Sequence, residues 1–249
     1  MRKIINAAKF TLNRWGVDFS IQRYPVFETL PFYIEKLGIN LVLDVGANEG
    51  QFGCDLRAAG YKGRILSFEP GELAFERLEA KAANDKLWMC RNCGLSSIER
   101  EAKLNVSENS VFSSLLKRSE DADLLGYGSP SLLGETVQLK RLDTVWPDLD
   151  CDNSRILLKT DTQGHDLSVI DGAGEYLEQI CAIQMEMAFR PMYSDQASVD
   201  AVLARMRDSG FVLIGLWKVC SSPITGELLE VDALFNRLTN APQAIGRTV

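Results

Sequence analysis

The sequence lacks the marks of several protein classes. Its 249 residues hold no run near the ~18–20 uninterrupted apolar residues that a membrane-spanning helix needs. The opening stretch, MRKIINAAKFTLNRWGV, carries charge but neither an apolar core nor a small-residue cleavage site, so we expect no secretory signal. Basic residues are few, with 27 Lys and Arg against 34 Asp and Glu. The resulting net charge of −7 disfavours a nucleic-acid partner.

Cysteine and histidine are scarce as well. Six thinly spread cysteines suggest reduced thiols in a cytoplasmic protein. Cys90 and Cys93 form a Cys-x-x-Cys, but no second pair or histidine stands at the spacing of a structural zinc site, so buried thiols on a strand explain them better. The sequence has no Gly-x-Ser-x-Gly after a strand and no Asn/Asp-Pro-Pro-aromatic signature. These absences disfavour a serine hydrolase and an N-methyltransferase of nucleobases or amide side chains.

The apolar pattern alternates between strand-like and helix-like segments. Strands are expected over 41–45, 64–68, 86–95, 155–161, 181–187, 211–219 and 230–237, and helices over 49–59, 71–84, 166–179 and 198–208. Two further strands, 101–106 and 135–142, enclose a Ser/Gly-rich stretch with the composition of a mobile loop. The alternation favours an α/β fold with a mostly parallel sheet and helices on both faces. Without repeats or low-complexity linkers, we expect one domain over 39–249 after a helical extension over 1–38.

The segment LVLDVGANEGQF joins the first strand to the first helix, where parallel sheets bind ligands. Gly46 and Gly50 give a Gly-x-x-x-Gly spacing around Asn48, not the Gly-x-Gly-x-x-Gly of dinucleotide sites. Asp44 would repel a pyrophosphate and attract an ammonium group, which S-adenosylmethionine has. Glu69 ends the next strand and could accept hydrogen bonds from both ribose hydroxyls. A plain glycine-rich turn with a helix cap is the alternative.

Motifs along most of the chain, about residues 41–236, resemble those of the FkbM family of S-adenosylmethionine-dependent methyltransferases. They are LDVGANEGQF, SFEP, SSLL, VQLKRLDT, LLKTDTQGHDLSVIDGA and VDALF. The resemblance implies a seven-stranded, Rossmann-like class I methyltransferase sheet with an antiparallel last strand, and S-adenosylmethionine as cofactor. It implies O-methylation of sugar hydroxyls in glycans or glycolipids, or of polyketides and related natural products. Pro70, Gly94 and Leu95 would then line the cofactor site. The family commonly has Glu where this chain has Asp166, which leaves the role of Asp166 open.

Methyl transfer to oxygen requires the acceptor to be held in line and its proton to be managed. Asp161, at the end of the fourth core strand, and Lys159, two residues earlier on the same face, are candidates for both tasks. Glu186 ends the neighbouring strand. Lys159 could instead only form an ion pair with Asp161 or Glu186. His165, the one histidine, is either the general base or an aromatic packing residue at a helix start.

Other signals leave more alternatives open. Ser113 and Ser114 are candidates for the acceptor side or ordinary turn serines. We expect no metal, although Asp143, Asp161 and Glu186 are the set that a Mg²⁺-dependent mechanism would use. An NAD-dependent oxidoreductase and a non-catalytic cofactor-binding module are the alternatives of other classes.

The N-terminal stretch, residues 1–16, carries Arg2, Lys3, Lys9 and Arg14 and no acid, with its apolar residues on one helical face. It either contacts an anionic membrane surface from the cytoplasmic side or covers the domain or a second copy in a homodimer.

Overall fold

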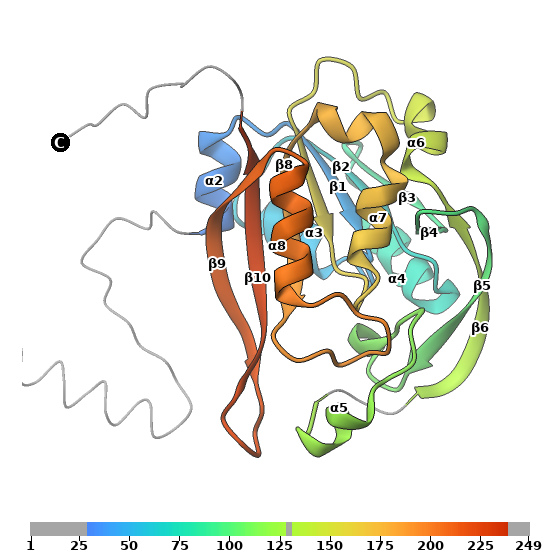
Figure 1. Ribbon diagram of the computed structural model, residues 1–249. Helices are drawn as coiled ribbons and strands as arrows, with labels where there is room; N and C mark the ends of the chain where they lie inside the picture. The colour runs from blue at the N-terminus through green and yellow to red at the C-terminus, as the bar shows by residue number, and fades with distance from the viewer. Residues whose placement is uncertain (1–28, 128–130, 239–249) are drawn as a thin grey trace, which may run out of the picture.

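The computed structural model describes residues 29–127 and 131–238. Its centre is a seven-stranded sheet in the order β3-β2-β1-β7-β8-β10-β9 (Figure 1). The strands are β1 (Leu41–Val45), β2 (Arg64–Phe68), β3 (Trp88–Arg91), β7 (Ile156–Thr160), β8 (Ile180–Ala188), β9 (Phe211–Ser221) and β10 (Leu228–Arg237). Strands β3, β2, β1, β7 and β8 are parallel, and β10 runs antiparallel between β8 and β9. The expected sheet, with its antiparallel last strand, is confirmed.

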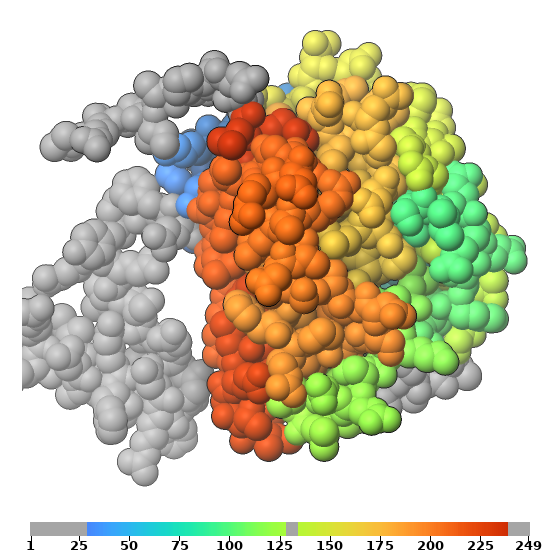
Figure 2. Space-filling model, in the orientation of Figure 1, coloured from blue at the N-terminus to red at the C-terminus, as the bar shows by residue number. Residues whose placement is uncertain are grey.

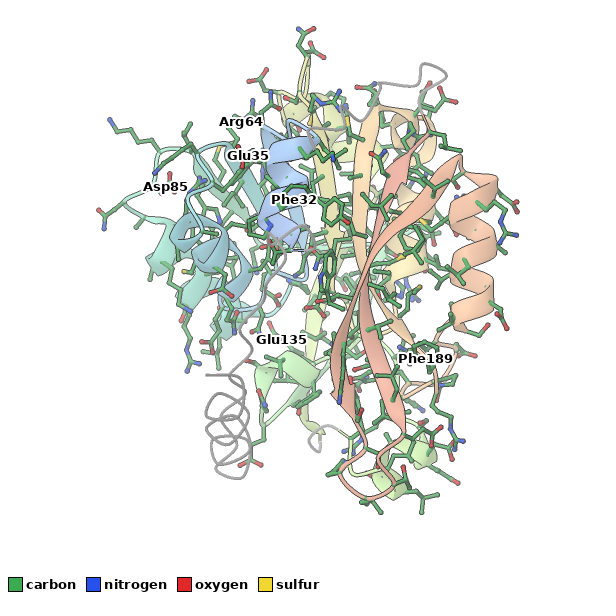
Figure 3. All side chains as sticks on the ribbon, turned by 90° about the vertical axis from the view of Figure 1, so that its left-hand side faces the viewer. Phe32, Glu35, Arg64, Asp85, Glu135 and Phe189 are labelled. Carbon is green, nitrogen blue, oxygen red and sulfur yellow. The ribbon has the colours of Figure 1, made fainter. Side chains whose placement is uncertain are left out.

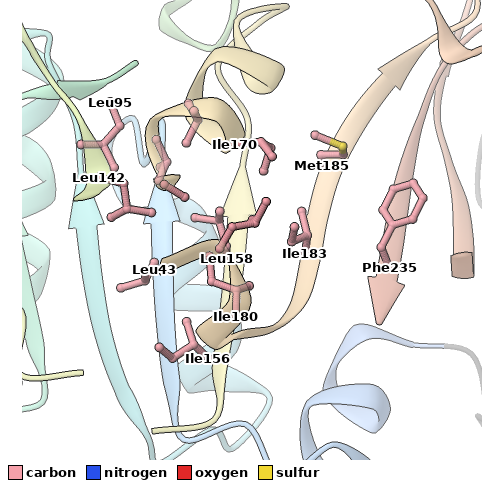
Figure 4. Close-up of a cluster of buried hydrophobic side chains, with 14 of the residues drawn as sticks. Leu43, Leu95, Leu142, Ile156, Leu158, Ile170, Ile180, Ile183, Met185 and Phe235 are labelled. Carbon is pink, nitrogen blue, oxygen red and sulfur yellow. The ribbon is translucent and has the colours of Figure 1, made fainter. Parts of the chain in front are cut away.

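Alternate side chains of the central strands enter two cores, one on each face of the sheet. Val42, Ile65 and Leu157 face one side. Leu43 and Leu158 face the other, where Figure 4 shows them packed together. Because both faces are buried, these strands are continuously apolar instead of alternating apolar and polar residues.

Helices cover both faces of the sheet. One layer consists of α2 (Leu30–Lys36), α3 (Gln51–Ala58) and α4 (Glu72–Ala82), and the other of α6 (Leu142–Val145), α7 (Asp166–Gly172) and α8 (Val199–Asp208). In Figure 1, α7 and α8 lie in front of the sheet and α3 lies behind it. The space-filling view in Figure 2 shows that the α7–α8 layer hides most of the sheet on that side.

Two expected elements are divided in the structure. The helix expected over 166–179 is α7 followed by the 3₁₀ helix η3 (Gly174–Gln179), because Gly174 takes the left-handed φ of +53° that an α-helix cannot contain. The strand expected over 86–95 is β3 and a separate short strand, β4 (Gly94–Leu95). Pattern alone does not detect this division, because β4 leaves the main sheet and pairs elsewhere.

A second, three-stranded sheet has the order β4-β6-β5, with β5 (Arg100–Ser107) and β6 (Ser131–Lys140) forming the expected antiparallel pair. Between them, the Ser/Gly-rich stretch contains η1 (Ser110–Phe112) and α5 (Glu120–Leu124), not a plain loop. Its backbone bonds to the segment after β8: Ser119 N donates to Met192 O at 2.9 Å, and Ser194 N donates to Lys117 O at 2.7 Å. We call residues 107–127 the insertion. These bonds fix it over the carboxyl ends of the parallel strands.

Helix α2 belongs to the expected extension over 1–38. Tyr33 donates a hydrogen bond to Ile214 O of β9 at 2.9 Å and meets Trp217 edge to face. In Figure 3, α2 with Phe32 and Glu35 lies against the sheet on the side that faces the viewer. The amphipathic segment predicted over 1–16 lies outside the described residues. No helix in the part of the chain that the structure describes is long and apolar enough to span a bilayer.

Candidate active site

The loop between β1 and α3 is built from left-handed residues. Gly46, Asn48 and Gly50 have φ values of 72°, 48° and 83°. Only glycine fits at the first position, because a Cβ on Gly46 would stand 2.1 Å from the carbonyl oxygen of Asp161. The loop therefore passes directly over the end of β7 with its backbone open to a ligand. The Oδ1 atom of Asn48 is buried there and accepts no hydrogen bond.

Asp44 is fully buried beneath this loop. Its Oδ1 lies 3.0 Å from Lys159 Nζ, and its Oδ2 accepts a hydrogen bond from Ser67 Oγ at 3.1 Å. Lys159 also donates to Gly46 O at 3.2 Å and lies 3.7 Å from Asp161 Oδ2. Burial alone would lower the pKa of Lys159, but the charges of Asp44 and Asp161 outweigh it and the pKa is raised. Lys159 is thus a permanent cation that joins the two acids to the glycine loop.

Glu69 follows β2 with both carboxylate oxygens engaged. Oε2 accepts from Asn48 N and Oε1 accepts from Gly71 N, each at 2.8 Å. Burial raises the pKa of Glu69 to about 7, against the lowering effect of these two bonds and of Lys159. Each oxygen keeps a second lone pair for a ligand hydroxyl.

These groups surround a cleft of about 290 Å³, which we call the first cleft. Most of the predicted cofactor residues line it, namely Gly46, Asn48, Glu69, Pro70, Gly94 and Leu95, and so do Lys159, Asp161, Ser113 and Ser114. Gly50 and Asp44 stand outside the lining, Gly50 as the N-cap of α3 and Asp44 behind Lys159. Ser113 Oγ accepts from Ser107 N at 3.1 Å, and Ser114 Oγ donates to Gln163 O at 2.7 Å. Both hydroxyls therefore also hold the insertion in place.

A second cleft, of about 370 Å³, adjoins the first. The two share Val111, Asp161 and Gln163 in their linings. The rest of the second cleft comes from the insertion, from strands β8, β9 and β10, and from the loop between β9 and β10: Phe112, Gly126, Tyr127, Glu186, Val219, Cys220, Ser221, Pro223, Leu229 and Glu230. The fold thus places Asp161, whose side chain is 45% exposed, at the junction of two clefts.

Gln163 is the functional candidate that sequence reasoning missed. Its Oε1 accepts from the hydroxyls of Tyr193 at 2.8 Å and Tyr127 at 3.3 Å. Its Nε2 donates to Asp161 Oδ1 at 3.1 Å and to Glu186 Oε2 at 3.2 Å. Because the two phenols fix the amide orientation, the amide nitrogen holds both carboxylates at the junction. The one sequence signal is its place in DTQG, where it takes a left-handed φ of 52°.

Acidic groups dominate this end of the sheet. Burial, and repulsion from Asp161 and Glu230, raise the pKa of Glu186 well above its usual range. Burial also raises the pKa of Glu230, and it raises that of Asp232 to about 6. No Lys, Arg or His stands among the described residues that line the second cleft.

His165 lies outside both linings. Its Nε2 lies 3.0 Å from Ser96 Oγ, near the start of α7. From its place in the sequence near Asp161 and Asp166, one would expect His165 to have a raised pKa, but this expectation is wrong, because burial and the charge of Arg100 lower that pKa. The adjacent Asp166 is buried and accepts from Thr162 N at 3.1 Å through Oδ1, so it shapes the loop after β7.

The carboxylates that a Mg²⁺-dependent mechanism would use do not assemble. Asp143 pairs with Arg141 instead. Across residues 29–127 and 131–238, no three His, Cys, Asp or Glu side chains gather in a way that could hold a metal ion.

The family model of the methyltransferase FkbM domain matches residues 44–213, more than half of the chain. The chain belongs to the FkbM methyltransferase family. This membership makes it an enzyme that uses S-adenosylmethionine, as the sequence predicted, and not an oxidoreductase or a non-catalytic module. The residues of the first cleft fit that cofactor, since the glycine loop leaves its backbone open and both Glu69 oxygens can accept from hydroxyls.

Several solved structures resemble this FkbM methyltransferase at low identity. Magnesium protoporphyrin IX methyltransferase from Synechocystis PCC 6803, solved with bound S-adenosylmethionine, is 12% identical, with coverage of 84% of this chain and 74% of that one and a TM-score of 0.46. A TehB-like methyltransferase from Corynebacterium glutamicum is 10% identical, with coverages of 95% and 97% and a TM-score of 0.42. Fibrillarin from Aeropyrum pernix is 11% identical, with coverages of 79% and 66% and a TM-score of 0.42. No curated protein matches the chain significantly.

Proposed function

We propose that this FkbM methyltransferase transfers a methyl group to a hydroxyl oxygen of a sugar in a glycan or glycolipid. The observation that carries the proposal is the pair of adjoining clefts with Asp161 and Gln163 between them. The first cleft has the residues for the cofactor. The second has carboxylates and aromatic rings at its wall, which suit a polyhydroxylated ring with polar edges and an apolar face.

In the first cleft, S-adenosylmethionine supplies an electrophilic methyl group on a positively charged sulfur. We assign Glu69 to the ribose hydroxyls and the left-handed loop at Gly46 to close backbone contact. Asp44 acts through Lys159, since Lys159 stands between Asp44 and the cleft. The Asp44–Lys159 pair keeps the loop and the end of β7 in register.

At the junction, Asp161 would accept the hydrogen bond of the acceptor hydroxyl and take its proton as that oxygen receives the methyl group. Gln163 holds Asp161 from one side, and Lys159 stabilises the carboxylate from the other. Glu186 shares the Gln163 amide and orients the acceptor. His165 serves packing at the start of α7 in this scheme.

The apolar part of the second cleft, Phe112, Val219 and Leu229, would also suit a polyketide or related natural product with a hydroxyl group. We propose a cytoplasmic enzyme, for which residues 1–16 would provide contact with a membrane surface if the acceptor is a glycolipid. Those residues lie outside the described part of the chain.

Methyl transfer from labelled S-adenosylmethionine to a panel of free sugars, glycolipids and polyketides tests the proposal. The expected product is a sugar methyl ether, identified by mass spectrometry and by its stability to acid. A methyl group found on nitrogen or on carbon, or transfer to polyketides alone, would overturn the sugar O-methyltransferase assignment.

A further inference from the structure

The second cleft has more carboxyl groups than a hydroxyl acceptor needs. One carboxylate is enough to orient a hydroxyl and take its proton, and Asp161 provides it. Glu186 and Glu230 line the same cleft, and no cationic side chain stands among its described lining residues. Lys159, the nearest cation of the neighbouring cleft, is already paired with Asp44 and Asp161.

Among the carboxyl residues of the second cleft, Glu230 gives the strongest indication of the kind of ligand that binds there. It is only 1% exposed, yet it lines the second cleft. Its Oε2 accepts a weak bond from Cys220 Sγ at 3.5 Å. Its Oε1 is buried and receives no hydrogen bond of ordinary geometry, although the nearby Tyr127 hydroxyl is the main group that lowers the carboxyl pKa. A buried carboxylate oxygen without a donor is costly, and a donor supplied by a ligand would remove that cost.

Two ligand chemistries could satisfy such oxygens. A metal ion needs several of these groups around one point, and the described residues form no such group. The amide of Gln163 also occupies the space between Asp161 and Glu186. An ammonium group instead has three donors that can reach carboxylates spaced apart. The aromatic wall of Phe112 and Tyr127 adds the π-faces that a cation favours.

We propose that the second cleft selects an acceptor that carries an ammonium group, such as an amino sugar, and binds this group with Glu230 and Glu186. This inference rests on the proposed function, since Asp161 still faces the hydroxyl that is methylated. Burial, and repulsion from Asp161 and Asp166, raise the pKa of both glutamates in the free enzyme. A cationic acceptor offsets that repulsion, whereas a neutral sugar leaves it in place.

Calorimetric titration in the presence of saturating S-adenosylhomocysteine tests the selection directly. The probes are glucosamine, N-acetylglucosamine and glucose, which share a ring and differ in charge. Glucosamine should bind at least about tenfold more tightly than either neutral probe, as charge-assisted bonds in a desolvated cleft are strong. Equal binding of the three probes would overturn the inference.

Substitutions of the two glutamates test whether they cause the preference for glucosamine. Glu230→Gln and Glu186→Gln should each bring glucosamine close to the neutral probes, with S-adenosylhomocysteine binding unchanged. Glu227→Gln is the matched control, because Glu227 is a partly exposed glutamate of the same hairpin that pairs with Arg190. A preference for glucosamine that survives in both cleft variants would refute the assignment.

The two proposals fail separately. A sugar methyl ether formed without any preference for an amine overturns only the ammonium inference. A preference for glucosamine combined with methyl transfer to its nitrogen supports charge recognition and overturns the proposed O-methylation.

Discussion

Asp161 is the residue on which the proposed chemistry depends most. We expect Asp161→Asn to leave S-adenosylhomocysteine affinity within about threefold and to lower turnover at least ~100-fold, the range for loss of a general base or orienting group. Asparagine keeps the size of the side chain but cannot take a proton. Steady-state kinetics with calorimetry measure the two effects.

Asp171→Asn is the control for that variant, because Asp171 is a half-exposed aspartate that pairs with Arg205 outside both clefts. Its turnover should stay near that of the parent. If Asp161→Asn also turns over normally with the true acceptor, proton removal belongs to another group or to solvent.

Glu69 makes cofactor binding depend on pH. Its pKa of about 7 means that the carboxyl is largely protonated at pH 6 and ionised at pH 8, and only the ionised form accepts from two ribose hydroxyls. The dissociation constant of S-adenosylhomocysteine should therefore rise as pH falls through about 7, approaching tenfold per pH unit. Glu69→Ala should weaken binding by about 1.5–3 kcal/mol, and Asp44→Ala by a similar amount through Lys159. A parent protein whose affinity is flat from pH 6 to 8 would exclude this role for Glu69.

His165 is expected to pack and not to act as a base. It lies outside both linings and bonds to Ser96, and burial holds its pKa below 6.5. His165→Phe should keep turnover within about threefold and leave the pH–rate profile unchanged, because a ring of similar size fills the same space. If the turnover of the parent rises with pH and that rise is absent in His165→Phe, the result would support His165 as the general base.

At the scale of elements, the β1–α3 loop depends on steric fit more than on flexibility. Gly46 and Gly60 both have left-handed φ values, 72° and 94°, so alanine strains either backbone by about 1 kcal/mol. Only at Gly46 would the added Cβ also meet the end of β7, since nothing lies within 4 Å of that position at Gly60.

Gly46→Ala should therefore reduce cofactor affinity by at least about 30-fold, whereas Gly60→Ala should lose only a little stability and no affinity. Calorimetry and thermal denaturation of the two variants give the comparison. Equal effects at both positions would mean that backbone strain alone, and not contact with Asp161, makes glycine necessary in the loop.

At the scale of the whole molecule, the buried acids couple stability to pH. The pKa values of Glu69, Asp166, Glu186, Glu230 and Asp232 are all raised in the folded state. A carboxyl that binds its proton more tightly when folded stabilises the fold below its unfolded pKa, near 4, and that contribution is lost as pH rises toward 7. His165, with a lowered pKa, acts in the opposite direction below about pH 6.5.

Because five acids oppose one histidine, we expect the ligand-free protein to melt about 5 °C lower at pH 8 than near pH 5.5, for a net loss of ~1–2 kcal/mol. Scanning calorimetry across this range measures the change. A double variant with Glu186→Gln and Glu230→Gln should show a flatter dependence. A melting temperature that rises steadily to pH 8 would contradict the assigned protonation states.

The sequence by itself determined the sheet and the first cleft. Predominantly apolar runs such as LVLDV are typical of strands that are buried on both faces of a sheet. The glycines that follow this run predict a tight turn, and in the structure they take left-handed φ values. The predicted strand ends therefore placed Gly46, Glu69 and Asp161 correctly at one edge. Asp161 and Lys159 were identifiable because period two places them on the same face of one strand.

Tertiary structure alone decided how these groups are paired and what faces the acceptor. Lys159 contacts Asp44 because β1 and β7 are neighbours in register, a pairing that no local pattern encodes. Glu230 enters the second cleft because β10 inserts antiparallel between β8 and β9, far from Asp161 in sequence. Gln163 connects Asp161 to Glu186, and the orientation of its amide is fixed only once the insertion brings Tyr127 over the sheet. Such contacts depend on chain segments that meet after folding, so their energies, and the acidic character of the cleft, arise only in the assembled molecule.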